Sequence, residues 1–250
     1  MPVQVAGRRI EALEIPGDRA GAPIVLLHEG LGSVGLWRDF PTRLAQATGR
    51  RLIAYSRLGS GRSQRRERTS SPLRFHHDEA LELLPELLSE LAIYEPLLVG
   101  HSDGASIALI HAGRHPVSGL ALMAPHVFVE PLTVASIRET RRSYVQGGLR
   151  ERMAKHHDDP DAAFWGWCDV WLDPDFPAWN LEADTAMVRA PTLLIQGRDD
   201  PYGTLEQLRR IEANLTGPVE RLVVEGGHSP HLDAVEEVLR ALGRFAASVG

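Results

Sequence analysis

Residues 96–104 read PLLVGHSDG, an apolar run that leads directly into the pattern G-x-S-x-G. The residues that follow, 105–110, are small or apolar and favour a helix. A strand, a sharp turn and a helix in this order set the serine on a strained corner, where its hydroxyl projects clear of the backbone. Gly100 and Gly104 flank this corner because strand and helix pack too closely there for larger side chains. We therefore predict that Ser102 is an activated nucleophile.

An activated serine needs a base and a group that orients the base. The apolar run 191–196 leads to Asp200, and the run 219–224 leads to His228. Each candidate follows a predicted strand, at the edge where open α/β sheets place their sites. The order serine, aspartate, histidine along the chain is typical of one fold and differs from the chymotrypsin and subtilisin orders.

The chain resembles the α/β-hydrolase superfamily over essentially its whole length. Five blocks in the right order carry the resemblance: LLHEGLGS at 26–33, GSGRS at 59–63, GHSDG at 100–104, GRDD at 197–200 and GH at 227–228. It implies the α/β-hydrolase fold, an α/β architecture with a mostly parallel eight-stranded sheet flanked by helices. It also implies a small helical lid inserted after the sixth strand, and a triad of Ser102 as nucleophile, His228 as base and Asp200 as acid.

Two members of this triad have rivals in the sequence. Asp199 is adjacent to Asp200, which the family spacing Gly-x-x-Asp selects. Glu130 is the candidate in relatives that carry the acid after the sixth strand. His231 lies three residues after His228, which the Gly-Gly-His context favours.

The resemblance further implies an oxyanion hole made of two backbone N–H groups. One belongs to Asp103, the residue after the nucleophile, and a match without a gap places the other at Gly30. Family members usually have His-Gly-x in that loop, whereas this chain has His-Glu-Gly. An ionised Glu29 that pointed inward would oppose the developing negative charge. We therefore expect it to turn away and to pair with Arg57 or Arg62.

The side chain of Asp103 is also unusual, since Met, Leu or Gln is more common after the nucleophile in the family. The Ser-Asp-Gly sequence is similar to that of valacyclovir hydrolase-like proteins. The carboxylate could recognise a cationic group of the substrate, or it could anchor neighbouring loops by a hydrogen bond. We expect the anchoring role.

Apolar runs along the rest of the chain alternate with helical patterns, which predicts a parallel sheet covered on both faces. Residues 3–15 are expected to form a hairpin that turns at Gly7, and residues 75–91 a helix that Pro85 kinks or breaks. Residues 126–185 do not continue this alternation of strands and helices, and they form the predicted lid. Residues 1–125 and 186–250 then form the α/β core. Trp165, Trp167 and Trp171 lie in the lid, where we expect aromatic side chains to line an apolar substrate pocket.

Composition limits the possible partners. The net charge of −6 gives no general attraction to nucleic acid or to anionic membranes. The N-terminus lacks a signal-peptide pattern, and no run approaches the roughly 18 apolar residues that span a bilayer. One cysteine, Cys168, fits a reducing compartment, so we expect a cytoplasmic protein.

Two further groups of residues carry alternative interpretations. Four arginines between residues 62 and 68 are expected to form a solvated face, the alternative being a site for an anionic or coenzyme A substrate. The histidine pairs at 76–77 and 156–157 lack the carboxylate spacing of a zinc site. We therefore expect neither a metal nor another cofactor.

Together these features predict a serine hydrolase that cleaves a small-molecule ester or thioester through an acyl-enzyme intermediate. The main alternative is hydrolysis of a carbon–carbon bond in aromatic ring-cleavage products, because the same triad supports both chemistries. Hydrolysis of an amino-acid ester or amide is suggested by Asp103. A receptor that binds a small molecule with little turnover is the alternative from another class. The sequence leaves the oligomeric state open.

Overall fold

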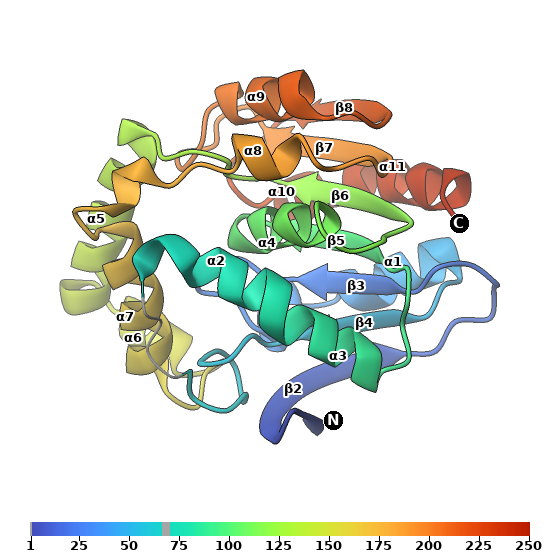
Figure 1. Ribbon diagram of the computed structural model, residues 1–250. Coiled ribbons are helices and arrows are strands. Elements are labelled where there is room, and N and C mark those ends of the chain that lie inside the picture. Colours follow the sequence, from blue (N-terminus) through green and yellow to red (C-terminus); the bar gives the residue numbers. More distant parts are fainter. Residues whose placement is uncertain (1, 67–70) are drawn as a thin grey trace.

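The computed structural model describes residues 2–66 and 71–250. One eight-stranded sheet runs through the molecule in the order β1-β2-β4-β3-β5-β6-β7-β8, and helices cover both of its faces (Figure 1). Strands β1 and β2 pair antiparallel, as do β2 and β4, and all other neighbours are parallel. The predicted fold class is therefore confirmed. The strands are β1 (Pro2–Val5), β2 (Arg8–Ile15), β3 (Ile24–Leu27), β4 (Leu52–Tyr55), β5 (Leu97–His101), β6 (Gly119–Met123), β7 (Thr192–Gly197) and β8 (Val219–Val224).

The N-terminal hairpin forms as the sequence predicts. Its two turn residues, Ala6 and Gly7, have φ angles of 47° and 77°. A two-residue turn with both central residues at positive φ matches the right-handed twist of the flanking strands. Val5 consequently pairs directly with Arg8.

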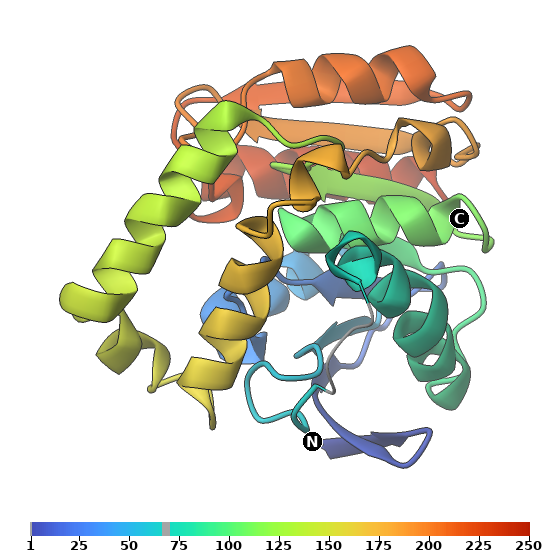
Figure 2. The same ribbon diagram turned by 60° about the vertical axis from the view of Figure 1, so that its left-hand side comes forward.

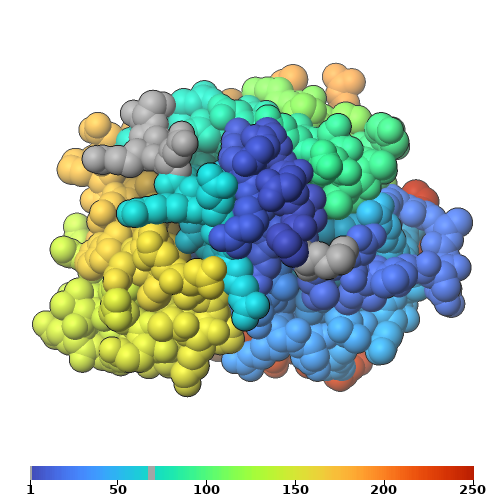
Figure 3. Space-filling view, turned by 90° about the horizontal axis from the view of Figure 1, so that it is seen from below, coloured from blue at the N-terminus to red at the C-terminus, as the bar shows by residue number. Residues whose placement is uncertain are grey.

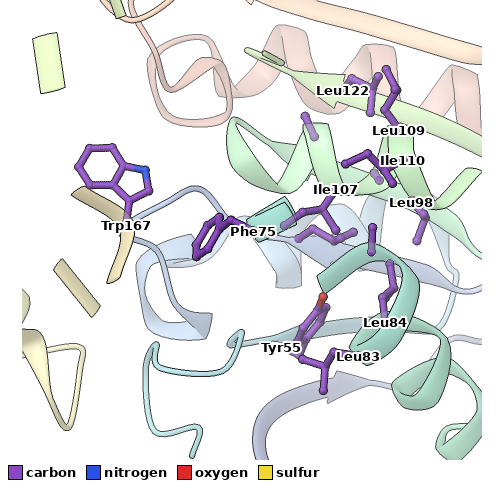
Figure 4. Close-up of a cluster of buried hydrophobic side chains, with 14 of the residues drawn as sticks. Tyr55, Phe75, Leu83, Leu84, Leu98, Ile107, Leu109, Ile110, Leu122 and Trp167 are labelled. Carbon is purple, nitrogen blue, oxygen red and sulfur yellow. The ribbon is translucent and has the colours of Figure 1, made fainter. Parts of the chain in front are cut away.

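Alternate residues of the central strands enter two hydrophobic clusters on opposite faces of the sheet. On one face, Leu97 and Val99 pack with α1 (Phe40–Thr48) and α11 (Val235–Ser248). On the other face, Leu98 packs with α4 (Asp103–Ala112) and α3 (Leu84–Glu90). Figure 4 shows part of this second cluster, with Ile107 on α4 and with Leu98 and Leu122 on β5 and β6. Strands β3, β5 and β7 are buried along their whole length, which fixes the positions of their carboxyl ends, and β8 pairs with β7.

The helical segment around Pro85 is not broken. Helix α2 (Phe75–Asp78) continues through a π-helical turn, η3 (Glu79–Leu83), into α3. Pro85 has no N–H with which to satisfy the carbonyl of Ala80, five residues earlier. The Nδ1–H of buried His111 donates to that carbonyl instead, at 2.9 Å. Of the predicted kink or break, the break does not occur, because a π-turn and one side-chain hydrogen bond accommodate Pro85.

The chain between β6 and β7, residues 124–191, is a mostly helical insertion that contains the predicted lid. Figure 2 shows its helices α5 and α7 beyond the end of the sheet at which the parallel strands finish. Asp159 caps α7 by accepting a hydrogen bond from the N–H of Ala162 at 2.9 Å. Phe128 and Asn180 form an isolated antiparallel bridge where the insertion leaves and rejoins the core. Its helices are α5 (Pro131–Gln146), α6 (Leu149–Met153), α7 (Pro160–Trp171), η4 (Phe176–Ala178) and α8 (Glu182–Thr185).

The remaining helices are short or lie at the edge of the sheet. None of the helices formed by the described residues has the length and apolar character needed to cross a membrane. These elements are η1 (Val34–Trp37), η2 (Pro72–Arg74), α9 (Glu206–Asn214) and α10 (Pro230–Asp233).

Candidate active site

Ser102 occupies the sharp corner between β5 and α4. Its φ of 53° and ψ of −118° lie in a region that residues other than glycine rarely adopt. A Cβ atom at Gly100 would lie 2.4 Å from the carbonyl oxygen of Gly104, and one at Gly104 would lie 2.1 Å from that of Leu27. The two glycines are therefore required by close backbone packing, as the G-x-S-x-G pattern predicts.

His228, in the loop between β8 and α10, bridges Ser102 and Asp200. Its Nε2 lies 2.9 Å from the hydroxyl oxygen of Ser102. Its Nδ1 lies 2.8 Å and 2.9 Å from the two carboxylate oxygens of Asp200. Because an ionised carboxylate can only accept, Nδ1 carries the proton and Nε2 is free to accept the proton of the serine. The structure thus brings together the three side chains that the sequence selects for the triad.

Two residues that the sequence analysis did not identify hold Asp200. The backbone N–H of Tyr202 donates to it at 2.8 Å, and the side-chain amide of Gln196 donates at 2.7 Å. Burial raises the pKa of Asp200, but the hydrogen bonds from His228 and Tyr202 outweigh burial and keep the pKa below its ordinary value. The carboxylate therefore stays ionised and can orient the imidazole.

The rival residues have other positions. Asp199 is exposed, beside the buried Asp200. Glu130 is buried and accepts hydrogen bonds from Thr204 and from the amide of Gln207, at 2.7–3.0 Å. It thereby ties the start of α5 to α9. His231 is buried in α10.

The loop after β3 is held by the carbonyl group of Glu29. This oxygen accepts from Nδ1 of His28 at 2.6 Å, from the guanidinium of Arg57 at 2.7 Å and from the N–H of Gly32 at 3.0 Å. Burial lowers the pKa of His28 to about 3, so its imidazole is neutral and its Nε2 accepts the backbone N–H of Arg57. Across a trans peptide the N–H of Gly30 points opposite to this carbonyl.

Two backbone N–H groups are therefore available beside the nucleophile. Gly30 lines the same cavity as Ser102. The N–H of Asp103 lies in the first turn of α4, where a helix provides no acceptor of its own. Both groups are those that the sequence selects as oxyanion donors.

The expected pairing of Glu29 with Arg57 or Arg62 is wrong. The carboxylate of Glu29 faces Nδ1 of His101 at 3.6 Å. Arg57 is engaged elsewhere, because its guanidinium lies 3.8 Å from the buried carboxylate of Asp103. The backbone N–H of Arg62 donates to Glu11.

The side chain of Asp103 anchors the elbow to the helical insertion. It is 1% exposed and accepts a hydrogen bond from the indole N–H of Trp171 at 3.2 Å. Nε2 of His76 lies 3.2 Å away. Burial raises the pKa of Asp103, but His76 and Arg57 outweigh it and lower the pKa to about 2. The anchoring role is therefore the one that these contacts support.

A cavity of about 180 Å³ opens above Ser102. Trp167 and Trp171 of α7 reach it, whereas Trp165 packs on the outer side against Tyr144 and Phe164. The volume is below the range of pockets for drug-sized ligands, about 300–1,000 Å³. It is lined by Glu29, Gly30, Leu31, Ser102, Asp103, His126, Thr133, Ile137, Trp167, Trp171, Tyr202 and His228.

The basic loop and the histidine pairs have structural contacts. Arg66 pairs with the buried carboxylate of Glu79 at 2.5 Å, while Arg62 and Arg65 are exposed and Arg68 lies outside the described residues. Figure 3 shows this loop, in cyan, at the surface between the dark blue hairpin and the yellow part of the insertion. Nδ1 of His157 accepts the N–H of Gly61 at 3.0 Å. Within the part of the chain that the structure describes, no group of three or more His, Cys, Asp or Glu is placed to hold a metal ion.

Comparison with known proteins identifies the family. Residues 24–241 match the model of the alpha/beta hydrolase family, and the chain belongs to that family. It is 32% identical over 258 residues to a 2-hydroxymuconate semialdehyde hydrolase from Pseudomonas sp. (strain CF600), covering 91% of this chain and 88% of that protein. It is 24% identical to a proline iminopeptidase from Lactobacillus crispatus, covering 97% and 92%. The fold is similar to that of an esterase from Exiguobacterium antarcticum, with a TM-score of 0.76, 20% identity and 98% of both chains covered.

Proposed function

We propose that this alpha/beta hydrolase cleaves a small-molecule ester or thioester through an acyl-enzyme formed on Ser102. The observation that carries the proposal is the continuous hydrogen-bonded chain from Ser102 through His228 to Asp200, at 2.9 Å and 2.8 Å, at the base of a small cavity. This geometry meets the distance criterion for a nucleophile and its general base.

The reaction starts when the hydroxyl oxygen of Ser102 attacks the acyl carbonyl carbon while Nε2 of His228 accepts the serine proton. Asp200 stabilises the imidazolium that results. The N–H groups of Gly30 and Asp103 donate to the oxyanion of the tetrahedral intermediate. His228 then gives its proton to the leaving alcohol or thiol, and the acyl group remains on the serine. A water molecule then transfers a proton to His228 as its oxygen attacks the acyl carbon of the ester. The second tetrahedral intermediate breaks its bond to the serine oxygen, which takes the proton back from His228, and the acid is released.

The helical insertion acts as the lid of this site. Thr133 and Ile137 from α5, and Trp167 and Trp171 from α7, line the cavity opposite the triad. The limited volume suits a short acyl group. The single cysteine, Cys168, is buried and free, which supports a cytoplasmic location.

Carbon–carbon bond hydrolysis is less well supported by the charges of the cavity. The Pseudomonas relative is named for a substrate that is a carboxylate, 2-hydroxymuconate semialdehyde. Among the described residues that line the cavity of this chain there is no Lys or Arg, and the carboxylate of Glu29 is partly exposed there. This charge disfavours an anionic substrate.

Hydrolysis of an amino-acid ester or of an N-terminal amino acid is the second candidate. Relatives named proline iminopeptidase match the chain, and the partly exposed carboxylate of Glu29 lines the cavity, where a cationic substrate group could meet it. Comparison of an amino-acid ester with its des-amino analogue separates the candidates. Equal kcat/KM values support the simple ester, and an advantage of tenfold or more for the amine supports the second candidate.

A fluorophosphonate probe tests the proposed chemistry directly. We expect stoichiometric labelling of Ser102, detected by intact mass and peptide mapping, and no labelling of a Ser102→Ala variant. A folded wild-type protein that resists the probe and turns over no ester, thioester or ring-cleavage product would instead support a binding protein.

A further inference from the structure

His101 lies directly before the nucleophile and touches both other loops of the site. Its side chain is 2% exposed. Its Nε2 lies 2.6 Å from the backbone carbonyl oxygen of His228. A carbonyl can only accept, so Nε2 carries a proton and donates it. Its other nitrogen, Nδ1, lies 3.6 Å from a carboxylate oxygen of Glu29.

This arrangement leaves a neutral His101 with an unfavourable contact. With its proton on Nε2, a neutral imidazole would direct the lone pair of Nδ1 toward the carboxylate of Glu29. Nδ1 is buried and has no hydrogen-bond partner, and burial of such a nitrogen beside a negative charge is costly. A proton between Nδ1 and the carboxylate removes this cost.

We propose that His101 and Glu29 share one proton. We further propose that this pair positions two loops relative to Ser102: the oxyanion loop after β3, which carries Gly30, and the base loop after β8, which carries His228. The inference rests on the function proposed above. Glu29 precedes the oxyanion donor Gly30, and the imidazole of His101 also holds the carbonyl of His228. One side chain thus connects the oxyanion loop, the elbow and the base loop. The shared proton neutralises a carboxylate that would otherwise oppose the oxyanion.

Among the described residues around the pair, Arg57 binds the backbone carbonyl of Glu29 and faces the carboxylate of Asp103, and no ion pair joins it to the carboxylate of Glu29. The ring of His231, on α10, lies 4.8 Å from that of His101, and burial lowers its pKa to about 3. His28, at the end of β3, is neutral for the same reason. The positive charge of Arg38, which follows η1, also lowers the pKa of His231. The ring of His228 lies 5.1 Å from that of His101. The ring of Trp37, which carries no charge, lies 6.3 Å from that of His101.

Glu29 holds its charge in this setting. Burial raises the pKa of Glu29, but the imidazole of His101, 3.6 Å from the carboxylate, outweighs burial, and the pKa falls below its ordinary range. The shared proton therefore resides on His101. Without that proton the pair would carry a net negative charge beside the oxyanion loop, and turnover should fall.

The test is the pH profile of kcat with a neutral aryl acetate. We expect wild-type kcat to fall at alkaline pH, where the pair loses its shared proton. The Glu29→Gln variant should lack the alkaline fall. His101→Gln keeps a donor for the carbonyl of His228 but carries no charge, so its kcat should be about tenfold lower at all pH values with KM unchanged. Glu225→Gln, at an exposed carboxylate in the same loop as His228, is the matched control and should keep the wild-type profile.

A second measurement reports the proton without turnover. In 15N-histidine NMR spectra at neutral pH, we expect both nitrogens of His101 to be protonated in the wild type, and one in Glu29→Gln. The proposal is overturned if wild-type His101 has one unprotonated nitrogen, or if Glu29→Gln keeps the wild-type pH profile. Turnover that survives in Ser102→Ala would refute the proposed hydrolase mechanism itself, which is a different outcome.

Discussion

A single methyl group added at Gly30 tests the oxyanion loop. The new Cβ atom would lie 2.1 Å from Nε1 and 2.3 Å from Cδ1 of Trp167, whereas ordinary contacts begin at 3.4 Å. Trp167 is 7% exposed and belongs to the buried cluster of α7, so its ring has little room to move. The loop must therefore shift by about 1 Å, and the N–H of residue 30 shifts with it.

The size of the effect follows from the role of that N–H group. A misplacement of about 1 Å can lower a rate by about 10², and removal of one oxyanion donor costs about 10²–10³ in turnover. We expect Gly30→Ala to lower kcat by about 10², which is about 2.7 kcal/mol of transition-state stabilisation. KM should change little, because the donor acts mainly on the transition state. The assay is steady-state hydrolysis of a short-chain aryl ester.

Two further variants decide whether the contact with Trp167 is the cause. Gly166→Ala adds a methyl group to α7, where nothing lies within 4 Å of the new atom, and should keep wild-type kcat. Trp167→Ala in combination with Gly30→Ala makes room for the methyl group and should recover most of the lost kcat. Circular dichroism and thermal unfolding establish that each variant is folded. A folded Gly30→Ala enzyme with at least half of the wild-type kcat would refute the assignment of residue 30 as a donor.

Three other predictions test the site and the core. Trp167→Ala alone should enlarge the cavity and shift kcat/KM toward longer acyl chains across a series of esters, whereas an unchanged preference would place the acyl group elsewhere. Asp200→Asn should lower kcat by about 10⁴, because the imidazole loses its orienting carboxylate. Glu130→Gln, the comparison at the rival acid, should keep kcat within about twofold and lower the free energy of unfolding by about 1–3 kcal/mol. Burial lowers the pKa of His28 and of His126 to about 3, so below about pH 6.5 the unfolded chain binds protons that the folded protein does not. The free energy of unfolding should therefore decrease as the pH falls from 6.5, by up to about 1.4 kcal/mol per pH unit for each histidine. Urea unfolding at pH 7.5 and pH 5.5 measures this, and equal stabilities would contradict it.

The elements that place the triad could be predicted because backbone geometry restricts their sequence. Gly100 and Gly104 are needed where a Cβ atom would overlap the backbone, and strands buried on both faces read as continuous apolar runs. The predicted strand before Ser102 corresponds to β5, and the hairpin turns at Gly7. Such features depend on residues that are close in sequence.

Side-chain pairing across loops could not be predicted in the same way. Arg57 follows β4 and Asp103 follows β5, and only the fold brings them within 3.8 Å. Once Arg57 is engaged there, Glu29 has to find another partner. The contacts of Gln196 and Tyr202 with Asp200 are local by comparison, since they span four and two residues, and the one from the N–H of Tyr202 forms an Asx turn.

The positions of the tryptophans along α7 follow from helical periodicity, which the sequence already contains. Trp167 and Trp171 are four residues apart, so they lie on one face of α7, and both line the cavity. Trp165 is two residues from Trp167 and lies on another face, where the guanidinium of Arg141 stacks over its ring. Helical periodicity within residues 160–171 would therefore have separated the pocket residues from the outer one.

Two carboxylates lie near the nucleophile in this chain, and each of them faces different basic side chains. Asp103 faces Arg57 and His76, while Glu29 faces His101. Arg57 could not neutralise both, because its guanidinium already binds the carbonyl of Glu29 and faces Asp103. An acid in the oxyanion loop therefore requires its own cation, and the residue before the nucleophile is placed to provide it. If this is correct, Glu29 and His101 depend on each other, and the double variant Glu29→Gln/His101→Gln should be more active than His101→Gln alone.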